Sequence, residues 1–232
     1  MERFGFVFTF GLGLFVLSIL LSGVLPAIAL NARDGEYLTL DQLTAEVPDS
    51  FHELVTAYPA PFEKHYGLES GKKANSATYK EALQLGRDFY IAEACWHCHS
   101  QYIRPVAKET QRWGWVSEAD EYNNAMYRPS LWGTRRTGPD LTRQHDVHTN
   151  DWQLSHLYDP RSTSPGSIMP GYSWFFEEER DAKTGEVTKV TPGKRAIAVV
   201  TYLRWLGSLR AKWEKERRAA ERAKRPKPTE EE

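Results

Sequence analysis

Five consecutive residues, Cys95-Trp96-His97-Cys98-His99, constrain this chain more than any other feature of its sequence. The spacing C-x-x-C-H is that of a c-type haem attachment site, where two thiols add across the haem vinyl groups and the following histidine binds the iron. These two cysteines are the only ones among 232 residues, so neither is available for another role. The sequence therefore predicts one covalent haem c on Cys95 and Cys98, with His99 as an axial iron ligand.

Three other uses of a cysteine pair are the alternatives: a disulfide between Cys95 and Cys98, a redox dithiol, and half of a zinc site. A structural zinc site usually has a second Cys/His pair at short spacing. Here the nearest other histidines, His145, His148 and His156, lie far downstream. A redox C-x-x-C motif follows a strand and requires no histidine after the second cysteine. The pattern therefore favours haem over all three.

The N-terminal region is apolar. Residues 4–30 hold no charged side chain, and as a helix they would extend roughly 40 Å, against a hydrocarbon core of about 30 Å. Ala27-Ile28-Ala29 is similar to a signal-peptide cleavage site, so a cleaved leader is the alternative. The apolar run is longer than the hydrophobic region of a leader, and only Arg3 precedes it as a basic side chain. We therefore expect residues 1–31 to be a retained transmembrane anchor in a lipid bilayer.

The orientation of this anchor follows from the haem motif, because the flanking charges are nearly balanced. Arg3 is opposed by Glu2, and Arg33 by Asp34, so loop charges give little direction. In bacteria, c-type haem is attached outside the cytoplasmic membrane. We therefore expect a single-pass protein of the bacterial inner membrane with its haem domain in the periplasm. The net charge of −1 gives no reason to expect nucleic acid as a partner.

Beyond the anchor, residues 32–77 are polar and interrupted by Pro48, Pro59 and Pro61, which predicts a periplasmic linker with one short helix near residues 40–46. Residues 78–209 are predicted to form the haem-binding domain. Three helix starts are expected there, at the capping box that begins with Thr78, after Thr149, and at Thr191-Pro192.

The predicted helices of this domain run from residue 79 to about 94, from residue 150 until Pro160, and from residue 192 through Leu206. Residues 181–188 are consistent with a hairpin, and no strand pattern supports a sizeable sheet.

The last segment, residues 210–232, changes character. Residues 210–225 are charged almost all round, with favourable pairs from Glu214 to Arg218 and from Glu221 to Arg225. Such a helix cannot bury a face, so we expect either a solvated helix or a partner-binding arm, with residues 226–232 frayed.

A second axial ligand is expected for a haem that transfers electrons, and thioether sulfur is the usual choice at high potential. Apart from the initiator, the methionines are Met126 and Met169. Met169-Pro170 lies in a loop of turns and prolines that orders at low entropic cost, so Met169 is the predicted ligand. Met126 and the three downstream histidines are the alternatives.

Further side chains are candidates for the surroundings of the haem. The Gly138-Pro139 turn can offer a carbonyl to the free ring N–H of His99, which would fix its orientation. Arginine pairs well with carboxylates such as the haem propionates, which makes Arg104 and Arg136 candidates. Trp132 is a candidate for closing the edge of the pocket.

Taken together, the order of C-x-x-C-H, Gly-Pro-x-Leu, Met-Pro and an aromatic C-terminal helix resembles class I cytochromes c. Several longer motifs resemble, more narrowly, the mono-haem (FixO-like) subunit of cbb(3)-type cytochrome c oxidases. They are Cys98-His99-Ser100-Gln101, Ile103-Arg104-Pro105, residues 131–141, Asp151-Trp152, residues 156–161 and residues 167–174. The resemblance implies an all-α fold, with one N-terminal transmembrane helix and a class I cytochrome c domain with loop insertions.

The same resemblance implies a role in electron relay. The chain would pass electrons from a periplasmic cytochrome c or a di-haem cytochrome c subunit to haem b of a polytopic haem-copper catalytic subunit, and would not be catalytic alone. One rival function is the same relay in a nitric oxide reductase or another membrane reductase. The other is a pentacoordinate haem that acts as a gas sensor or peroxidase.

Overall fold

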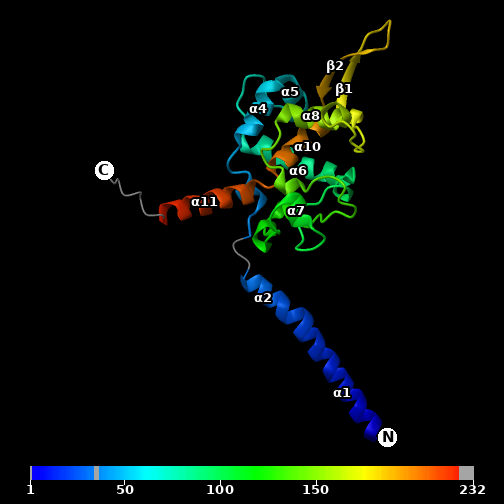
Figure 1. Cartoon of the computed structure of the whole chain (residues 1–232), viewed down its shortest axis with the longest axis vertical. Coiled ribbons are helices and arrows are strands. Elements are labelled where there is room, and N and C mark those ends of the chain that lie inside the picture. The colour runs from blue at the N-terminus through cyan, green and yellow to red at the C-terminus, as the bar shows by residue number, and fades with distance from the viewer. Residues whose placement is uncertain (1, 34–36, 225–232) are drawn as a thin grey trace, which may run out of the picture. The chain divides into compact units, whose positions relative to one another are not determined.

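A long apolar helix forms the N-terminal unit of the computed structural model, which describes residues 2–33 and 37–224. The helix consists of α1 (Glu2–Ile19), a π-helical stretch η1 (Leu20–Val24) and α2 (Leu25–Arg33), drawn in blue in Figure 1. Its segment Phe4–Ala29 is 26 residues long with a mean hydropathy of 2.4, and none of it is buried in the structure. Length and composition both suit a single crossing of a bilayer.

The second unit begins at Leu38 and is built around two crossing helices, α6 (Ser76–Ala92) and α10 (Lys194–Trp205). They meet at Gly86, where a Cβ atom would overlap the carbonyl oxygen of Ala198 and lie 2.8 Å from Cβ of Tyr202. Tyr90 packs edge-on against Tyr202, with ring centroids 5.3 Å apart. The missing side chain of Gly86 therefore allows the two helices their close approach.

Residues 38–66 form part of this unit, so the predicted linker over residues 32–77 is wrong there. They fold into α3 (Leu40–Leu43), α4 (Asp49–Ala57) and α5 (Pro59–Tyr66). Phe51 is buried on α4, and its ring lies 5.0 Å from that of Tyr79 and 5.5 Å from that of Phe62. Pro59 and Pro61 lie in the first turn of α5, where proline is well tolerated, and Pro48 precedes α4 as its N-cap, so none of the three interrupts a linker.

Between α6 and α10 the chain is mostly loops and short helical turns. These are η2 (Cys95–His97), α7 (Glu109–Trp113), η3 (Ala119–Tyr122), η4 (Ala125–Tyr127), η5 (Leu141–Arg143), α8 (Asn150–Tyr158), α9 (Pro160–Thr163) and η6 (Ser173–Phe175). The predicted all-α fold with one N-terminal span is confirmed.

One small hairpin interrupts the helices, in the place that the sequence indicates. Strands β1 (Phe176–Arg180) and β2 (Val187–Pro192) pair antiparallel, with Glu178 opposite Val190 and an irregularity at residues 179–180. The hairpin extends away from the helices in Figure 1.

Two of the three predicted helix starts differ from the structure. Asn75 caps α6 by accepting from the Thr78 backbone N–H at 2.9 Å, so the helix begins before Thr78. Pro192 ends β2, and α10 follows Gly193. The third start is confirmed, because the Thr149 side chain caps α8.

The charged C-terminal helix α11 spans Ser208–Lys224. Its first turn is not solvated as predicted, since Arg210 is buried and pairs with Glu121 and with Glu214. Residues 226–232, predicted to fray, lie outside the described residues, as do Arg225 and the side chains of Arg218 and Glu221. Both predicted helix pairs therefore fall at least partly outside the description, and Glu214 pairs with Arg210.

The crossing at Gly86 gives a stability prediction. Gly86→Ala should lower the free energy of unfolding by about 2–4 kcal/mol, because the new methyl group meets backbone as well as side-chain atoms and the helices must separate. The measurement is denaturant unfolding in detergent. Gln84→Ala, an exposed change on the same helix, should stay within about 0.5 kcal/mol of the parent. Equal stabilities for the two variants would contradict the close approach.

Candidate functional site

The haem motif lies directly after α6. Ala94 takes a left-handed backbone conformation with φ of 56°, which ends the helix, and Cys95-Trp96-His97 then form the turn η2. The backbone N–H of His99 donates to the carbonyl of Cys95 at 3.1 Å. Both cysteines are free thiols, Cys95 half-buried and Cys98 exposed. Burial raises the pKa of the Cys95 thiol to about 11, so this thiol is protonated at neutral pH.

His99 lies against the Gly138-Pro139 turn. Its ring Nδ1 is 3.0 Å from the carbonyl oxygen of Pro139, and the backbone N–H of Gly138 donates to the carbonyl of Cys98 at 3.0 Å. A Cβ atom at position 138 would lie only 2.6 Å from Nδ1 and 2.8 Å from Nε2 of the ring. Glycine is therefore needed where the turn meets the imidazole.

This contact gives His99 the state that a metal ligand requires. A carbonyl accepts but cannot donate, so Nδ1 carries the ring proton and Nε2 keeps its lone pair. Burial lowers the pKa of His99, which favours the neutral ring. Nε2 of His99 makes no hydrogen bond to another group in the described part of the chain.

A buried polar cluster holds the turn in place. Asp140 is fully buried and accepts hydrogen bonds from Ser100 Oγ at 2.7 Å and from the Thr142 backbone N–H at 3.0 Å, as well as from the Thr142 hydroxyl. Burial raises the pKa of Asp140, and the hydrogen bonds oppose that rise. Because Asp140 follows Pro139 and Ser100 follows His99, the cluster ties the carbonyl and the ring to one another.

The segment that follows Met169 contacts the haem motif and the residue that precedes it by two. The Tyr172 hydroxyl lies 4.0 Å from Cys95 Sγ, and Trp174 Nε1 donates to Glu93 at 3.3 Å. Met169 itself is half-buried against the core. Met126, the alternative ligand, is 3 % exposed and packs inside the core, as expected for a methionine that fills a gap between apolar side chains.

The three downstream histidines have other partners. His145 uses both ring nitrogens, with Nδ1 3.0 Å from the Arg204 carbonyl and Nε2 3.2 Å from Asp146. His148 and His156 both stack on Trp152, at 3.5 and 4.6 Å between ring centroids. Each of the three histidines therefore has a structural partner in the fold.

Arg104 and Arg136 both bind the carboxylate of Glu109, a contact for which the sequence gives no local signal. Arg104 Nε donates to Glu109 at 2.7 Å, and Arg136 Nη1 donates to Glu109 at 2.6 Å and to the Tyr102 carbonyl at 2.8 Å. Burial of Glu109 opposes its ionisation, but the two guanidinium groups outweigh burial and hold its pKa below the usual range. Trp132 is 60 % exposed and packs on Tyr102, with ring centroids 5.8 Å apart.

These residues fit a covalently bound haem. The two thiols are free and spaced as the attachment needs, and the adjacent imidazole is neutral with Nε2 available. Gly138 leaves the space beside that ring clear of a side chain. The described residues fit the zinc alternative less well than haem, because they contain no group of three His, Cys, Asp or Glu side chains placed to hold a metal ion.

Comparison with known protein families gives a match over most of the domain. Residues 66–224 match the family described as cytochrome C oxidase, mono-heme subunit/FixO. No curated protein matches the sequence. The matched region covers more than half of the chain and contains both cysteines, His99, the Gly138-Pro139 turn and Met169. The chain therefore belongs to the FixO family of mono-heme cytochrome c oxidase subunits.

Proposed function

We propose that this chain is a membrane-anchored mono-haem cytochrome c that relays electrons within a cbb(3)-type oxidase. Electrons would come from a periplasmic cytochrome c or a di-haem subunit and pass to haem b of the polytopic haem-copper subunit. The observation that carries the proposal is the His99–Pro139 hydrogen bond beside two free thiols, which prepares a neutral imidazole next to a covalent attachment site.

In this role each residue performs a binding or positioning task. Cys95 and Cys98 would hold the haem covalently, and His99 and Met169 would bind its iron. The carbonyl of Pro139 fixes the ring of His99, while Arg104 and Arg136 would pair with the propionates and Trp132 would cover the pocket edge. The bound haem supplies the one-electron redox chemistry, so these residues have to hold it in place and set its potential.

The location follows from the apolar helix and from where c-type haem is attached. The helix Phe4–Ala29 suits a single-pass anchor, and a subunit of this family works in a membrane-bound oxidase. The haem domain is proposed to lie in the periplasm, with the N-terminus in the cytoplasm. The family match favours an oxygen-reducing complex over a nitric oxide reductase.

The first prediction concerns covalent attachment. After denaturing electrophoresis, the parent chain should keep peroxidase-active haem on the polypeptide, and the double variant Cys95→Ala/Cys98→Ala should lose that stain. His97→Ala is the matched control: this residue lies between the cysteines and bonds Thr134, so the variant should keep its stain. Stain on the double variant would refute the covalent site.

The second prediction separates the two methionines. Met169→Leu should open the sixth position, allow carbon monoxide to bind the ferrous haem, and lower the potential by on the order of 0.1 V, within the range of about 0.8 V that axial ligands span. Met126→Leu should leave spectrum and potential unchanged and cost less than about 1.5 kcal/mol of stability. The reverse pattern in a redox titration would assign the ligand to Met126. A high-spin parent chain that binds gas as isolated would support the sensor or peroxidase function.

The third prediction concerns the complex. From detergent-solubilised membranes, the chain should copurify with a polytopic subunit that contains haem b, and the complex should reduce oxygen with reduced cytochrome c as donor. Met169→Leu should slow oxygen uptake severalfold, with the catalytic haems still present in the spectrum. A complex that turns over nitric oxide but not oxygen would instead support the reductase alternative.

A further inference from the structure

Basic charge is concentrated on α11. Its segment, residues 208–224, holds seven Lys or Arg and three Glu, a net charge of +4 in a chain whose total is −1. The rest of the chain therefore carries a net charge of −5. Lys212 and Lys215 are exposed, and α11 projects from the helical domain (Figure 1).

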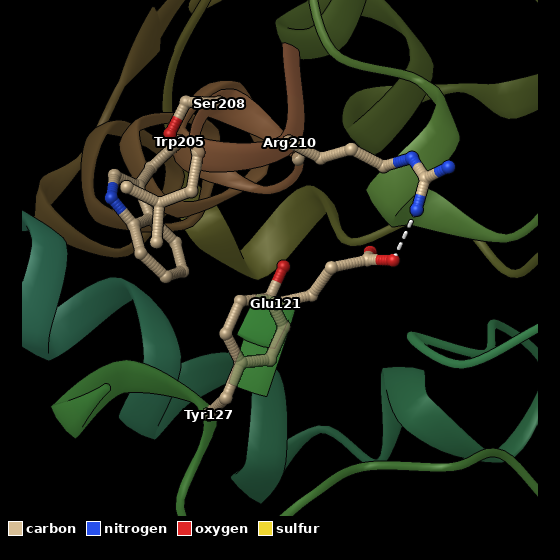
Figure 2. A pocket seen from close by; sticks show the side chains of 7 residues that line it. Glu121, Tyr127, Trp205, Ser208 and Arg210 are labelled. Carbon is tan, nitrogen blue, oxygen red and sulfur yellow. Dashed lines mark hydrogen bonds and ion pairs between the residues drawn. The ribbon is translucent and has the colours of Figure 1, made fainter. Parts of the chain in front are cut away.

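The start of α11 is fixed to the domain. Arg210 is 7 % exposed and reaches back to the buried carboxylate of Glu121, as Figure 2 shows. The preceding Gly207, with φ of 80°, lies so close to Thr142 that a Cβ atom would overlap its carbonyl oxygen. Two separate contacts therefore determine where the helix leaves the domain, and its 17 residues extend about 25 Å from there.

The same part of the domain receives the chain from the apolar helix. The Leu38 backbone N–H donates to the carbonyl of Asn123 at 3.1 Å, and Ala125 donates to the carbonyl of Leu38 at 3.0 Å. Asn123 is two residues from Glu121, which holds Arg210. Leu38 follows Ala29 by nine positions, so whatever the conformation of the chain between them, their separation is at most about 30 Å.

We propose that α11 is a membrane-surface arm, which binds the anionic phospholipid headgroups of the bilayer on the side where the domain lies. The inference depends on the apolar helix being an inserted anchor, but not on the redox role of the domain. An anionic surface attracts a cluster of four to eight basic side chains, and the tether keeps the start of α11 within reach of that surface.

The composition of α11 favours lipid over a protein partner. Protein interfaces have an apolar centre and are depleted in Lys and Glu. Residues 211–224 instead hold nine charged residues, with four alanines and one tryptophan between them. Trp213 is half-exposed, and a tryptophan among basic residues suits the headgroup region of a bilayer.

The test uses the full-length haem-loaded chain in nanodiscs of phosphatidylcholine, either alone or with about 30 % phosphatidylglycerol. Amide hydrogen exchange over residues 211–224 should be about fivefold slower, or more, in the anionic discs, and about 0.5 M salt should abolish the difference because it screens surface charge. Equal exchange in the two discs would overturn the proposal.

Two variants test whether the charge of α11 is responsible. Changing Lys212, Lys215, Arg217 and Arg218 to Gln keeps helix propensity and should remove the protection by anionic lipid. The matched control changes four lysines elsewhere, Lys72, Lys73, Lys183 and Lys189, all exposed, and should keep it. If residues 211–224 are protected in neutral discs only when the copurified oxidase subunits are present, α11 docks on protein and the lipid proposal is wrong.

Discussion

At Gly86 the backbone of α6 lies against the Ala198 carbonyl and the Tyr202 side chain, closer than any side chain at that position permits. Both helices that meet in this contact help to fix the position of the haem motif. The motif follows the C-terminal end of α6, and on α10 the Tyr202 hydroxyl accepts a hydrogen bond from the buried Gln101 amide at 2.9 Å. Because Gln101 is two residues after His99, the crossing of two helices also fixes the segment on which the imidazole is carried.

Backbone hydrogen bonds from that segment fix the position of the neighbouring loops. The carbonyl of His97 accepts from Arg135 at 2.8 Å, that of Cys98 from Gly138 at 3.0 Å, and that of Ser100 from Leu141 at 3.0 Å. The turn that contains the Pro139 carbonyl is therefore hydrogen-bonded to the haem motif on both sides of that carbonyl. A site built largely on loops can in this way position its ligand as a helix would, because each loop is bonded to a segment that the helices hold.

The features that could be predicted from the sequence are those in which a few neighbouring residues decide the outcome: the C-x-x-C-H motif, the apolar run, the Thr149 cap and the carbonyl in the Gly138-Pro139 turn. The features that were missed depend on residues far apart. The Phe51 ring is buried only because Phe62 and Tyr79 are brought to it. The spacing of the prolines, a local signal, therefore predicted a linker, whereas contacts with distant residues stabilise a packed helix.

The ion pairs of the buried carboxylates Glu121 and Glu109 also join residues far apart in the sequence, so they could not be predicted from local patterns. One of these pairs bears on how the haem would be held. Glu121 pairs with Arg143 and Arg210, and Glu214 supplies a second carboxylate to Arg210, so that cluster is balanced. Glu109 pairs with both Arg104 and Arg136, and the buried Asp140 acts on Arg136 as a further nearby charge.

Arginine can bind a second carboxylate with donors that the first leaves unused, so in the proposed haem-bound form this cluster would bind a propionate. Arg104 is the better placed of the two, because 43 % of its side chain is exposed against 9 % for Arg136. Glu109 would then act as a positioning residue, orienting both guanidinium groups from behind while Arg104 keeps donors for the propionate.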